Sequence, residues 1–454
     1  MNSKPLDGER VAAAGWPAAE VAASLLAALG AEPAGAPPDS TLRCGDEAPA
    51  GPGGEAVGAA LRLGDEAAAE PGGEAAGAAL RLGEQTVAAA PSTPAEDWAA
   101  SGVAELTGRP EGPPLMPVGA PATLARGLGL AIAALGGPPL DGAELLGWRV
   151  GAIPLERGGA RSAGGAARLL ATADGWVALS LPRPADAELV PALIDAGVGR
   201  EELDSALVGA EPEGDDPWPA LAAWAGGQTA AAVVEQAALL GLAVAALGER
   251  STAGPAWELR RLPADPLAAP TRVVVNLGAL WAAPLCAQLL RRAGWSVVDV
   301  EAAGRPDPSP PALRALLRAG HETVRLDLSE PAGRERLAEL LAGADAVIEA
   351  SRPRALRQLG LDADRVMADR RPRTWIRITG HGPESERIAF GDDAAVAGGL
   401  VTRDADGPAF AGDALADPLS GMTAAMLALA CTRAGGAWIA DVPMAGVAAM
   451  GAAT

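Results

Sequence analysis

The sequence predicts an α/β fold in which helices cover both faces of a parallel sheet. Between residues 272 and 379, short apolar runs alternate with amphipathic helical stretches, a pattern typical of strands that alternate with crossover helices. The chain has 454 residues, of which 49% are hydrophobic, so it exceeds the usual size of one core and we expect two or three domains. Tyr is absent and Phe occurs only 2 times, so Trp, Leu, Val and Ala must fill the cores.

The elements of this region follow from its periodicity. Strands are predicted at residues 272–276, 296–301, 323–328, 345–350 and 374–379, and helices at about 283–293 and 331–342. Ligands of such sheets bind beyond the carboxyl ends of the strands, so the expected binding loops start at Gly278, Ala302, Ala350 and Gly380. Glu301 lies near the position of the acidic residue that binds the ribose in NAD-dependent dehydrogenases. The first loop, however, has a single glycine in place of GxGxxG, so we do not expect a dehydrogenase.

Charge and cysteine content exclude several classes of protein. With 36 basic and 57 acidic residues the net charge is -21, which repels nucleic acid and anionic membranes, so neither is an expected partner. Cys44, Cys286 and Cys431 are too widely spaced for a disulfide framework or a metal site, and we expect no metal. The first residues lack the pattern of a signal peptide, and no segment is apolar for about 18 residues. We therefore expect a cytoplasmic protein.

A tandem repeat marks residues 1–94 as a low-complexity region. The segment GDEAPAGPGGEAVGAALRL from Gly45 returns as GDEAAAEPGGEAAGAALRL from Gly64. Two Gly-Pro-rich copies are too few for a solenoid, so the repeat is interpreted as a duplicated linker with short helices at EAVGAALRL and EAAGAALRL. A second linker is predicted from Arg250 to Pro270, which is rich in Pro and charge.

A second internal match relates the two halves of the chain. The segment VAELTGRPEGPPLMPVGAPATLARGLGLAIAAL from Val103 resembles GGLVTRDADGPAFAGDALADPLSGMTAAMLAL from Gly398. One gap places Gly127 opposite Gly421 and Thr123 opposite Asp417, whereas without the gap the partner of Asp417 is Ala122. In either alignment, the N-terminal copy has no carboxylate at this position.

Five segments carry a resemblance to a known family. They are RVVVNLGALWAAPLCAQLLRRAGWSVVDVE from Arg272, then TVRLDL, ADAVIEASRPRALRQLGLD, WIRITGHG and GDALADPLSGM. In this order they resemble the family III CoA-transferases (CaiB/BaiF type, which includes formyl-CoA transferase). The resemblance implies a doubly wound, Rossmann-like domain at residues 268–454 and a partial copy with a smaller α+β domain at residues 95–258. The family places its small domain second, so the order here is fused or permuted.

Asp417 is the candidate nucleophile. From spacing alone, Asp417 before Pro418 reads as a helix N-cap, and such a position also holds a carboxylate ionised by backbone N–H groups and the helix dipole. In the family, as the resemblance implies, an Asp at this place attacks an acyl-CoA thioester, giving a mixed anhydride and then an aspartyl-CoA thioester from which a carboxylic acid takes over the CoA. Gly412 and Gly421 would give the loop room over the thioester.

The resemblance also implies residues that bind coenzyme A. They are Trp281, Ala282, Leu326, Ala350, Ser351, Arg352, Arg354, Arg357, Gly380 and His381. Several family contacts are replaced: the basic NRGKRS segment reads Arg318-Ala319-Gly320-His321-Glu322-Thr323. His321 is expected in a loop, with a CoA contact as the alternative, and His381 either lines the acyl pocket or lies in an ordinary loop.

Three functions remain open at this stage. The first is a CoA-transferase that acts on acyl-CoA and a free carboxylic acid, with no permanently bound cofactor and, as the family implies, a homodimer. The second is a non-catalytic CoA-binding or interaction protein, which the depleted basic contacts favour. The third is an acyl-CoA racemase or isomerase of the same family, whose GHD motif reads Gly391-Asp392-Asp393 here. We rank it below the transferase because a carboxylate pair does not easily replace imidazole at neutral pH.

Overall fold

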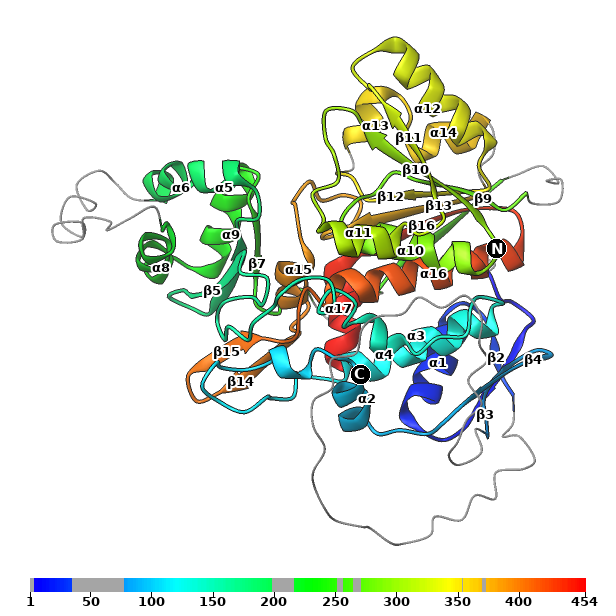
Figure 1. Ribbon diagram of the computed structural model, residues 1–454, viewed down its shortest axis with the longest axis horizontal. Helices are drawn as coiled ribbons and strands as arrows, with labels where there is room; N and C mark the ends of the chain where they lie inside the picture. The colour runs from blue at the N-terminus through cyan, green and yellow to red at the C-terminus, as the bar shows by residue number, and fades with distance from the viewer. Residues whose placement is uncertain are drawn as a thin grey trace, which may run out of the picture.

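The computed structural model describes residues 4–34, 77–197, 216–250, 256–263, 271–352, 354–369 and 373–454. Figure 1 shows three packed regions: a large sheet with its helices at the upper right, an N-terminal sheet with α1 and α3 below it, and a smaller α+β region at the left. None of the helices in these ranges combines the length and apolar character that crossing a membrane requires.

The large sheet confirms the predicted α/β class. Its seven strands run in the order β11-β10-β9-β12-β13-β16-β8. The bounds are β8 (Glu258–Leu262), β9 (Val273–Asn276), β10 (Ser296–Ala302), β11 (Glu322–Leu326), β12 (Ala346–Glu349), β13 (Thr374–Thr379) and β16 (Ala437–Pro443). All neighbours are parallel except β8, which is antiparallel to β16. The prediction of a plain linker from Arg250 to Pro270 was therefore wrong for β8, which is the edge strand of this sheet.

Alternation along the strands sorts their side chains onto the two faces of the sheet. Val275, Val347 and Trp375 belong to one buried cluster, whereas their neighbours Ile348 and Ile376 belong to another. The first cluster is covered by α12 (Pro331–Gly343), α13 (Arg354–Leu359) and α14 (Ala363–Asp369), and the second by α10 (Ala282–Arg292) and α16 (Ala416–Ala434). Helices on both faces are what a parallel sheet of apolar strands requires.

The smaller region is built from residues that precede the large sheet in sequence. Strands β5 (Ala167–Ala171), β6 (Trp176–Ser180) and β7 (Ala243–Ala246) form an antiparallel sheet. Its helices are α5 (Pro184–Glu188), α6 (Val190–Gly197), α8 (Trp218–Gly226) and α9 (Ala230–Leu239). Strands β6 and β7 pack on α15 (Gly391–Ala397), so the small region touches the segment that holds the Asp392-Asp393 pair.

The N-terminal sheet has the order β2-β1-β3-β4. Its strands are β1 (Arg10–Ala13), β2 (Glu32–Pro33), β3 (Gly77–Leu82) and β4 (Gln85–Ala89), and the helices that follow or cover it are α1 (Pro17–Ala28), α2 (Pro94–Ala100), α3 (Pro121–Ala134) and α4 (Gly142–Leu145). The helix predicted at EAAGAALRL was wrong, because its residues 77–82 form β3 and pair with both β1 and β4. The helix predicted at EAVGAALRL, and Cys44, lie outside the described residues.

Helices α1 and α3 repeat the packing of α10 and α16. In each pair a glycine allows close approach: a Cβ on Gly127 would lie 2.5 Å from Cγ1 of Val21 on α1, and one on Gly421 would lie 2.6 Å from the Ala282 oxygen on α10. Both first helices end before a left-handed glycine, Gly30 (φ 107°) and Gly294 (φ 88°). The geometry supports the alignment that sets Gly127 opposite Gly421 and Thr123 opposite Asp417.

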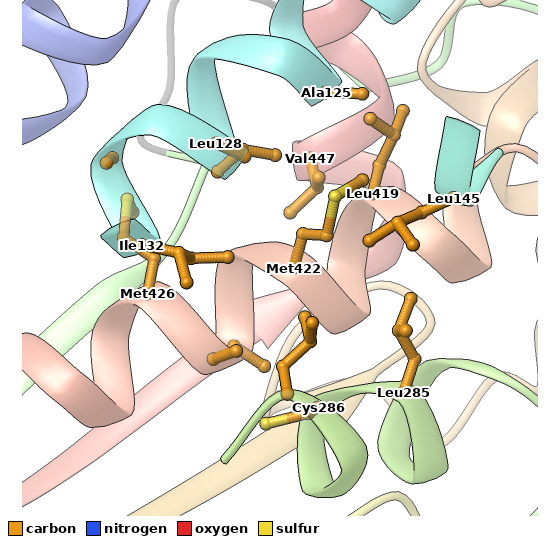
Figure 2. Packing of buried hydrophobic residues seen from close by; sticks show 14 of the residues in the cluster. Ala125, Leu128, Ile132, Leu145, Leu285, Cys286, Leu419, Met422, Met426 and Val447 are labelled. Atoms are coloured by element: carbon orange, nitrogen blue, oxygen red, sulfur yellow. The ribbon is translucent and has the colours of Figure 1, made fainter. Parts of the chain in front are cut away.

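Helices α3 and α16 also pack on each other, which joins the two halves. Figure 2 shows Leu128 and Ile132 of α3 on one side of Met422 and Met426 of α16, with Leu285 of α10 on the other. Helix α17 (Met444–Ala453) closes this core through Val447. The result is one continuous hydrophobic cluster that runs from the N-terminal sheet to the large sheet.

We expect Gly127→Ala to destabilise the protein by about 1–3 kcal/mol, because the added methyl group overpacks the contact between α3 and α1. Thermal unfolding followed by circular dichroism measures the loss. The control is Gly226→Ala at the end of α8, where an added Cβ meets no atom within 4 Å. Equal melting temperatures for the two variants would contradict the close packing at Gly127.

Candidate active site

Asp417 lies in the first turn of α16 and is half-buried. The helix begins at Ala416, its N-cap is Leu415, and it has no side-chain capping hydrogen bond. The interpretation of Asp417 as a helix N-cap was therefore wrong. The carboxylate is still close to the positive end of the helix dipole, which favours its charged form.

A tight turn presents Asp417 to the start of α15. Its backbone N–H donates to the oxygen of Ala414 (2.9 Å), a residue with a φ of 47° that is unusual for a side chain with a Cβ. A Cβ on Gly391 would lie 2.4 Å from Oδ2 of Asp417 and 2.5 Å from the Ala414 oxygen. Only glycine lets the backbone of α15 come this close, and the Gly391 backbone hydrogen bonds to the carboxylate.

Three further carboxylates surround this turn. Asp392 accepts a hydrogen bond from the Ala414 N–H (2.9 Å), and Asp393 accepts one from the Ser180 hydroxyl (2.8 Å). Asp413 is fully buried, and its Oδ1 accepts from Nη1 of Arg149 (2.8 Å), while its Oδ2 has no hydrogen-bond partner among the described residues. Gathering these groups concentrates negative charge beside the candidate nucleophile.

The environment raises the pKa values of these carboxyl groups. Burial raises the pKa of Asp417 to about 7; the guanidinium of Arg149 and the Gly391 backbone oppose the shift, and the negative charges of Asp392 and Asp413 add to it. Burial likewise raises the pKa of Asp393 to about 7 and that of Asp413 to about 7. The pKa of Asp392 is also raised, again chiefly by burial. Near neutral pH, a fraction of the Asp417 carboxyls is ionised and can act as a nucleophile.

Residues from the N-terminal half complete the site. Arg149 follows α4, and Ser180 ends β6 of the small region. The Thr107 hydroxyl accepts a hydrogen bond from the Gly412 N–H (2.8 Å) on the loop before α16. The residues that make these contacts lie far from residues 391–417 in sequence. Sequence motifs pointed only to Asp392, Asp393 and Asp417.

The predicted CoA-binding residues near the strand ends differ in burial. Trp281 and Ala282 are buried at the start of α10, and the Trp281 Nε1 is buried without a hydrogen-bond partner. Leu326 is buried at the end of β11. Ala350 is exposed beyond β12, and Ser351 donates a hydrogen bond to Oε1 of Glu349 (2.9 Å).

Two of the three predicted arginines share one carboxylate partner, Glu386. Arg357 pairs with Glu386 (2.8 Å), and Arg354 lies 3.9 Å from the same carboxylate. Burial lowers the pKa of Arg352, the guanidinium groups of Arg354, Arg183 and Arg305 lower it further, and the carboxylate of Glu386 opposes the shift. Arg183 comes from the small region and Arg305 from the loop after β10, and no sequence pattern predicted either residue at this place.

The two histidines differ in their surroundings. His321 lies in a loop, as predicted, but its ring is buried between Asp299 (2.9 Å) and Gln288 (2.8 Å). His381 follows Gly380 and lies 3.4 Å from Glu249; its Nε2 is buried without a hydrogen-bond partner. Burial lowers the pKa of His381 to about 3, so it is neutral at physiological pH. The acyl-pocket role of Gly380 and His381 stays a prediction.

A cavity of about 320 Å³ opens on the other side of the large sheet. Of the predicted site residues, Ser351 and Arg357 line it, and Asp417 does not. Neighbouring strands place Glu349, Arg377 and Asp441 side by side in its wall, and the two carboxylates disfavour an anionic ligand. Among the described residues, no group of three or more His, Cys, Asp or Glu side chains has the arrangement of a metal site.

The raised pKa values predict a pH-dependent stability. For a carboxyl group whose folded-state pKa of about 7 lies above the unfolded value of 3.8, the stabilising contribution is complete below pH 3.8 and is lost as the pH rises through 7. We expect the melting temperature to fall from pH 5 to pH 8, and Asp417→Asn to reduce that fall. The exposed Asp406→Asn is the control, and an equal effect of both variants would contradict the assigned pKa shift.

Comparison with known proteins supports the resemblance for the C-terminal part of the chain. Residues 271–450 match the family model described as CoA-transferase family III. A succinyl-CoA–D-citramalate CoA-transferase of Chloroflexus aurantiacus is 30% identical over 140 residues, which cover 28% of this chain and 35% of that protein. An acyl-CoA transferase of Fusarium pseudograminearum is 27% identical over 174 residues, covering 33% of this chain and 38% of that protein. The chain thus spans little more than a third of the length of these curated relatives.

Solved structures of two similar proteins cover part of the chain. A hypothetical protein of Mycobacterium tuberculosis is 28% identical with a TM-score of 0.37, covering 41% of this chain and 57% of that one. A CaiB/BaiF family protein of Brucella suis is 24% identical with a TM-score of 0.37, covering 42% of this chain and 55% of that one. The likeness of residues 271–450 to CoA-transferase family III therefore rests on the sequence match and not on these structures.

Proposed function

We propose that the protein transfers CoA from an acyl-CoA thioester to a free carboxylic acid, with Asp417 as the nucleophile. The observation that carries the proposal is the turn that holds a half-buried Asp417 against Gly391, with a pKa near 7. The carboxyl group there is partly ionised at neutral pH and poorly solvated, which suits covalent catalysis. The family match of residues 271–450 supports the same activity.

The reaction divides into balanced steps. An Asp417 oxygen attacks the thioester carbonyl, the C–S bond breaks, and a mixed anhydride and a CoA thiolate form. The thiolate attacks the Asp417 carbonyl and releases the donor carboxylate, which leaves an aspartyl-CoA thioester. The acceptor carboxylate then attacks the Asp417 carbonyl of this thioester, which forms a second mixed anhydride and frees the CoA thiolate. The thiolate attacks the acceptor carbonyl of this anhydride and forms the product acyl-CoA. Asp417 is regenerated, and neither a redox agent nor a proton is consumed.

The arginine cluster supplies a place for CoA phosphates. Arg352 and Arg305 form no ion pair with the described residues, although Glu386 acts on Arg352 from farther away, and both arginines lie in loops that follow strands. A chain of net charge -21 needs such a local cluster to hold an anionic ligand, because charges farther away than a Debye length of about 8 Å are screened. The expected homodimer and cytoplasmic location stay predictions.

A racemase or isomerase is the second candidate, and one observation favours it. The pKa of Asp393 is about 7 and that of Asp392 is raised, so a carboxyl pair here is closer to imidazole than an ordinary Asp. The two groups are engaged, however, by the Ala414 N–H and the Ser180 hydroxyl. Exchange of the acyl α-proton in heavy water without a carboxylic acid acceptor would favour this candidate over the transferase.

Asp417→Asn is expected to abolish CoA transfer while the fold is retained, because the amide cannot form the anhydride. Intact-mass analysis of the wild type with acyl-CoA alone should show a covalent adduct, and hydroxylamine should trap it at Asp417. Asp406→Asn is the matched control and should behave as wild type. A variant that keeps most of its kcat, or an adduct trapped on another residue, would rule out Asp417 as nucleophile.

Replacing both Arg352 and Arg305 with Ala is expected to raise the Kd for CoA by about tenfold or more, since a charge-assisted contact contributes about 1.5–3 kcal/mol. Conversely, Glu386→Gln should lower the Kd, because it frees Arg354 and Arg357 from their carboxylate. Isothermal titration measures both changes. Arg336→Ala on α12 removes the same charge at a distant exposed pair and serves as control; if it weakens binding as much as the double variant, the phosphates bind elsewhere.

A further inference from the structure

Arg149 links the N-terminal half to the loop that aims Asp417. Its Nη1 lies 2.8 Å from Oδ1 of Asp413, across 264 residues of sequence. The Asp413 side chain is 0% exposed, and its other oxygen has no hydrogen-bond partner in the part of the chain that the structure describes. A buried carboxylate held by one cation depends on that cation, because an unpaired buried charge costs several kcal/mol.

The loop that Arg149 holds is the one that orients the reacting group. Asp413 directly precedes Ala414, whose left-handed backbone receives the N–H of Asp417 and donates its own N–H to Asp392. A non-glycine residue keeps such a conformation only where its surroundings enforce it. The Arg149 to Asp413 ion pair is one such constraint, and the close approach of Gly391 to Ala414 is another.

Arg149 also opposes the negative charges that face Asp417. These are Asp392 on α15 and Asp413 on the loop before α16, whereas Arg149 comes from the segment after α4. Asp393 is turned to the Ser180 hydroxyl and the Phe390 N–H instead. In the described part of the chain, Arg149 is the cation whose charge most opposes the proton on Asp417.

We propose that Arg149 is a positioning residue: it fixes the Asp413-Ala414 turn that aims Asp417, and it supplies the positive charge beside that carboxyl group. This rests on the proposed function of Asp417 as nucleophile. The N-terminal half would then contribute to the reaction directly, although its own copy of α16 has Thr123 in place of the nucleophile. A chain cut between the halves would lose this charge.

The test compares Arg149→Gln with Arg109→Gln in the full chain. Arg109 is the matched control because it also joins the two halves, through Asp404 (2.9 Å), but on the hairpin of β14 (Val401–Asp404) and β15 (Gly407–Phe410). We expect Arg149→Gln to move the pH profile of kcat to higher pH by about one unit, which lowers kcat near pH 7 about fivefold, with little change in KM. Arg109→Gln should leave the profile unchanged.

Two more variants separate positioning from folding. Arg149→Gln combined with Asp413→Asn removes the buried unpaired charge and should recover much of the lost kcat, whereas Arg149→Lys should recover part of it. An unshifted profile in Arg149→Gln, or the same shift in Arg109→Gln, would reduce Arg149 to a structural clamp and overturn the proposal.

A second readout does not require activity. Carbodiimide with an amine nucleophile modifies protonated carboxyl groups, so peptide mass spectrometry of Asp417 modification against pH reports its titration in each variant. A higher midpoint in Arg149→Gln than in wild type supports the proposal, whether or not the protein turns over any donor and acceptor. A lack of turnover would count against the proposed function alone. Equal midpoints in the two proteins would overturn the role of Arg149.

Discussion

The burial of α16 between α3 and α10 is the constraint on which the site depends. Most of the helix is buried, and its partners come from the N-terminal half on one side and the large sheet on the other. A helix packed on two sides cannot rotate or slide without opening cavities in both contacts. Its first turn, which contains Asp417, is therefore fixed relative to the ends of β12 and β13. Gly421 makes the approach possible, since a side chain there would push α10 away.

Electrostatic strain is concentrated at one end of this helix. Asp392, Asp413 and Asp417 face one another, and Arg149 is the cation that opposes them. Such a cluster costs stability at neutral pH, and the rest of the core must supply the difference. The benefit is chemical: a carboxyl group with little solvation and a pKa near 7 switches easily between charged and neutral forms. An apolar replacement would stabilise the fold and remove the proposed nucleophile.

The parts of the structure that the sequence predicts are the local ones. Strands β9 to β13 were predicted because each is a short apolar run that can be recognised without its neighbours in the sheet. The motif around Asp417 identified the candidate nucleophile. Segment EAAGAALRL has high helix propensity, and pairing with β1 and β4 overrides it in residues 77–82. Strand β8 was missed because ELRRL is polar, as an exposed edge strand often is. Arg149 and Arg183 reach the site only through tertiary folding, so no local pattern marks them.

The two copies of the helix pair show why one of them is the better candidate for chemistry. In the N-terminal copy, Thr123 donates to buried Asp97 (2.6 Å) and Arg126 pairs with the same carboxylate (2.7 Å), so that charge is fully compensated. In the C-terminal copy, Asp413 keeps one oxygen without a partner among the described residues, and Asp417 accepts a backbone hydrogen bond from Gly391. A carboxylate whose two oxygens are both hydrogen-bonded is stabilised by its partners and is therefore a weaker nucleophile. The incomplete pairing of the second cluster fits the role proposed for Asp417.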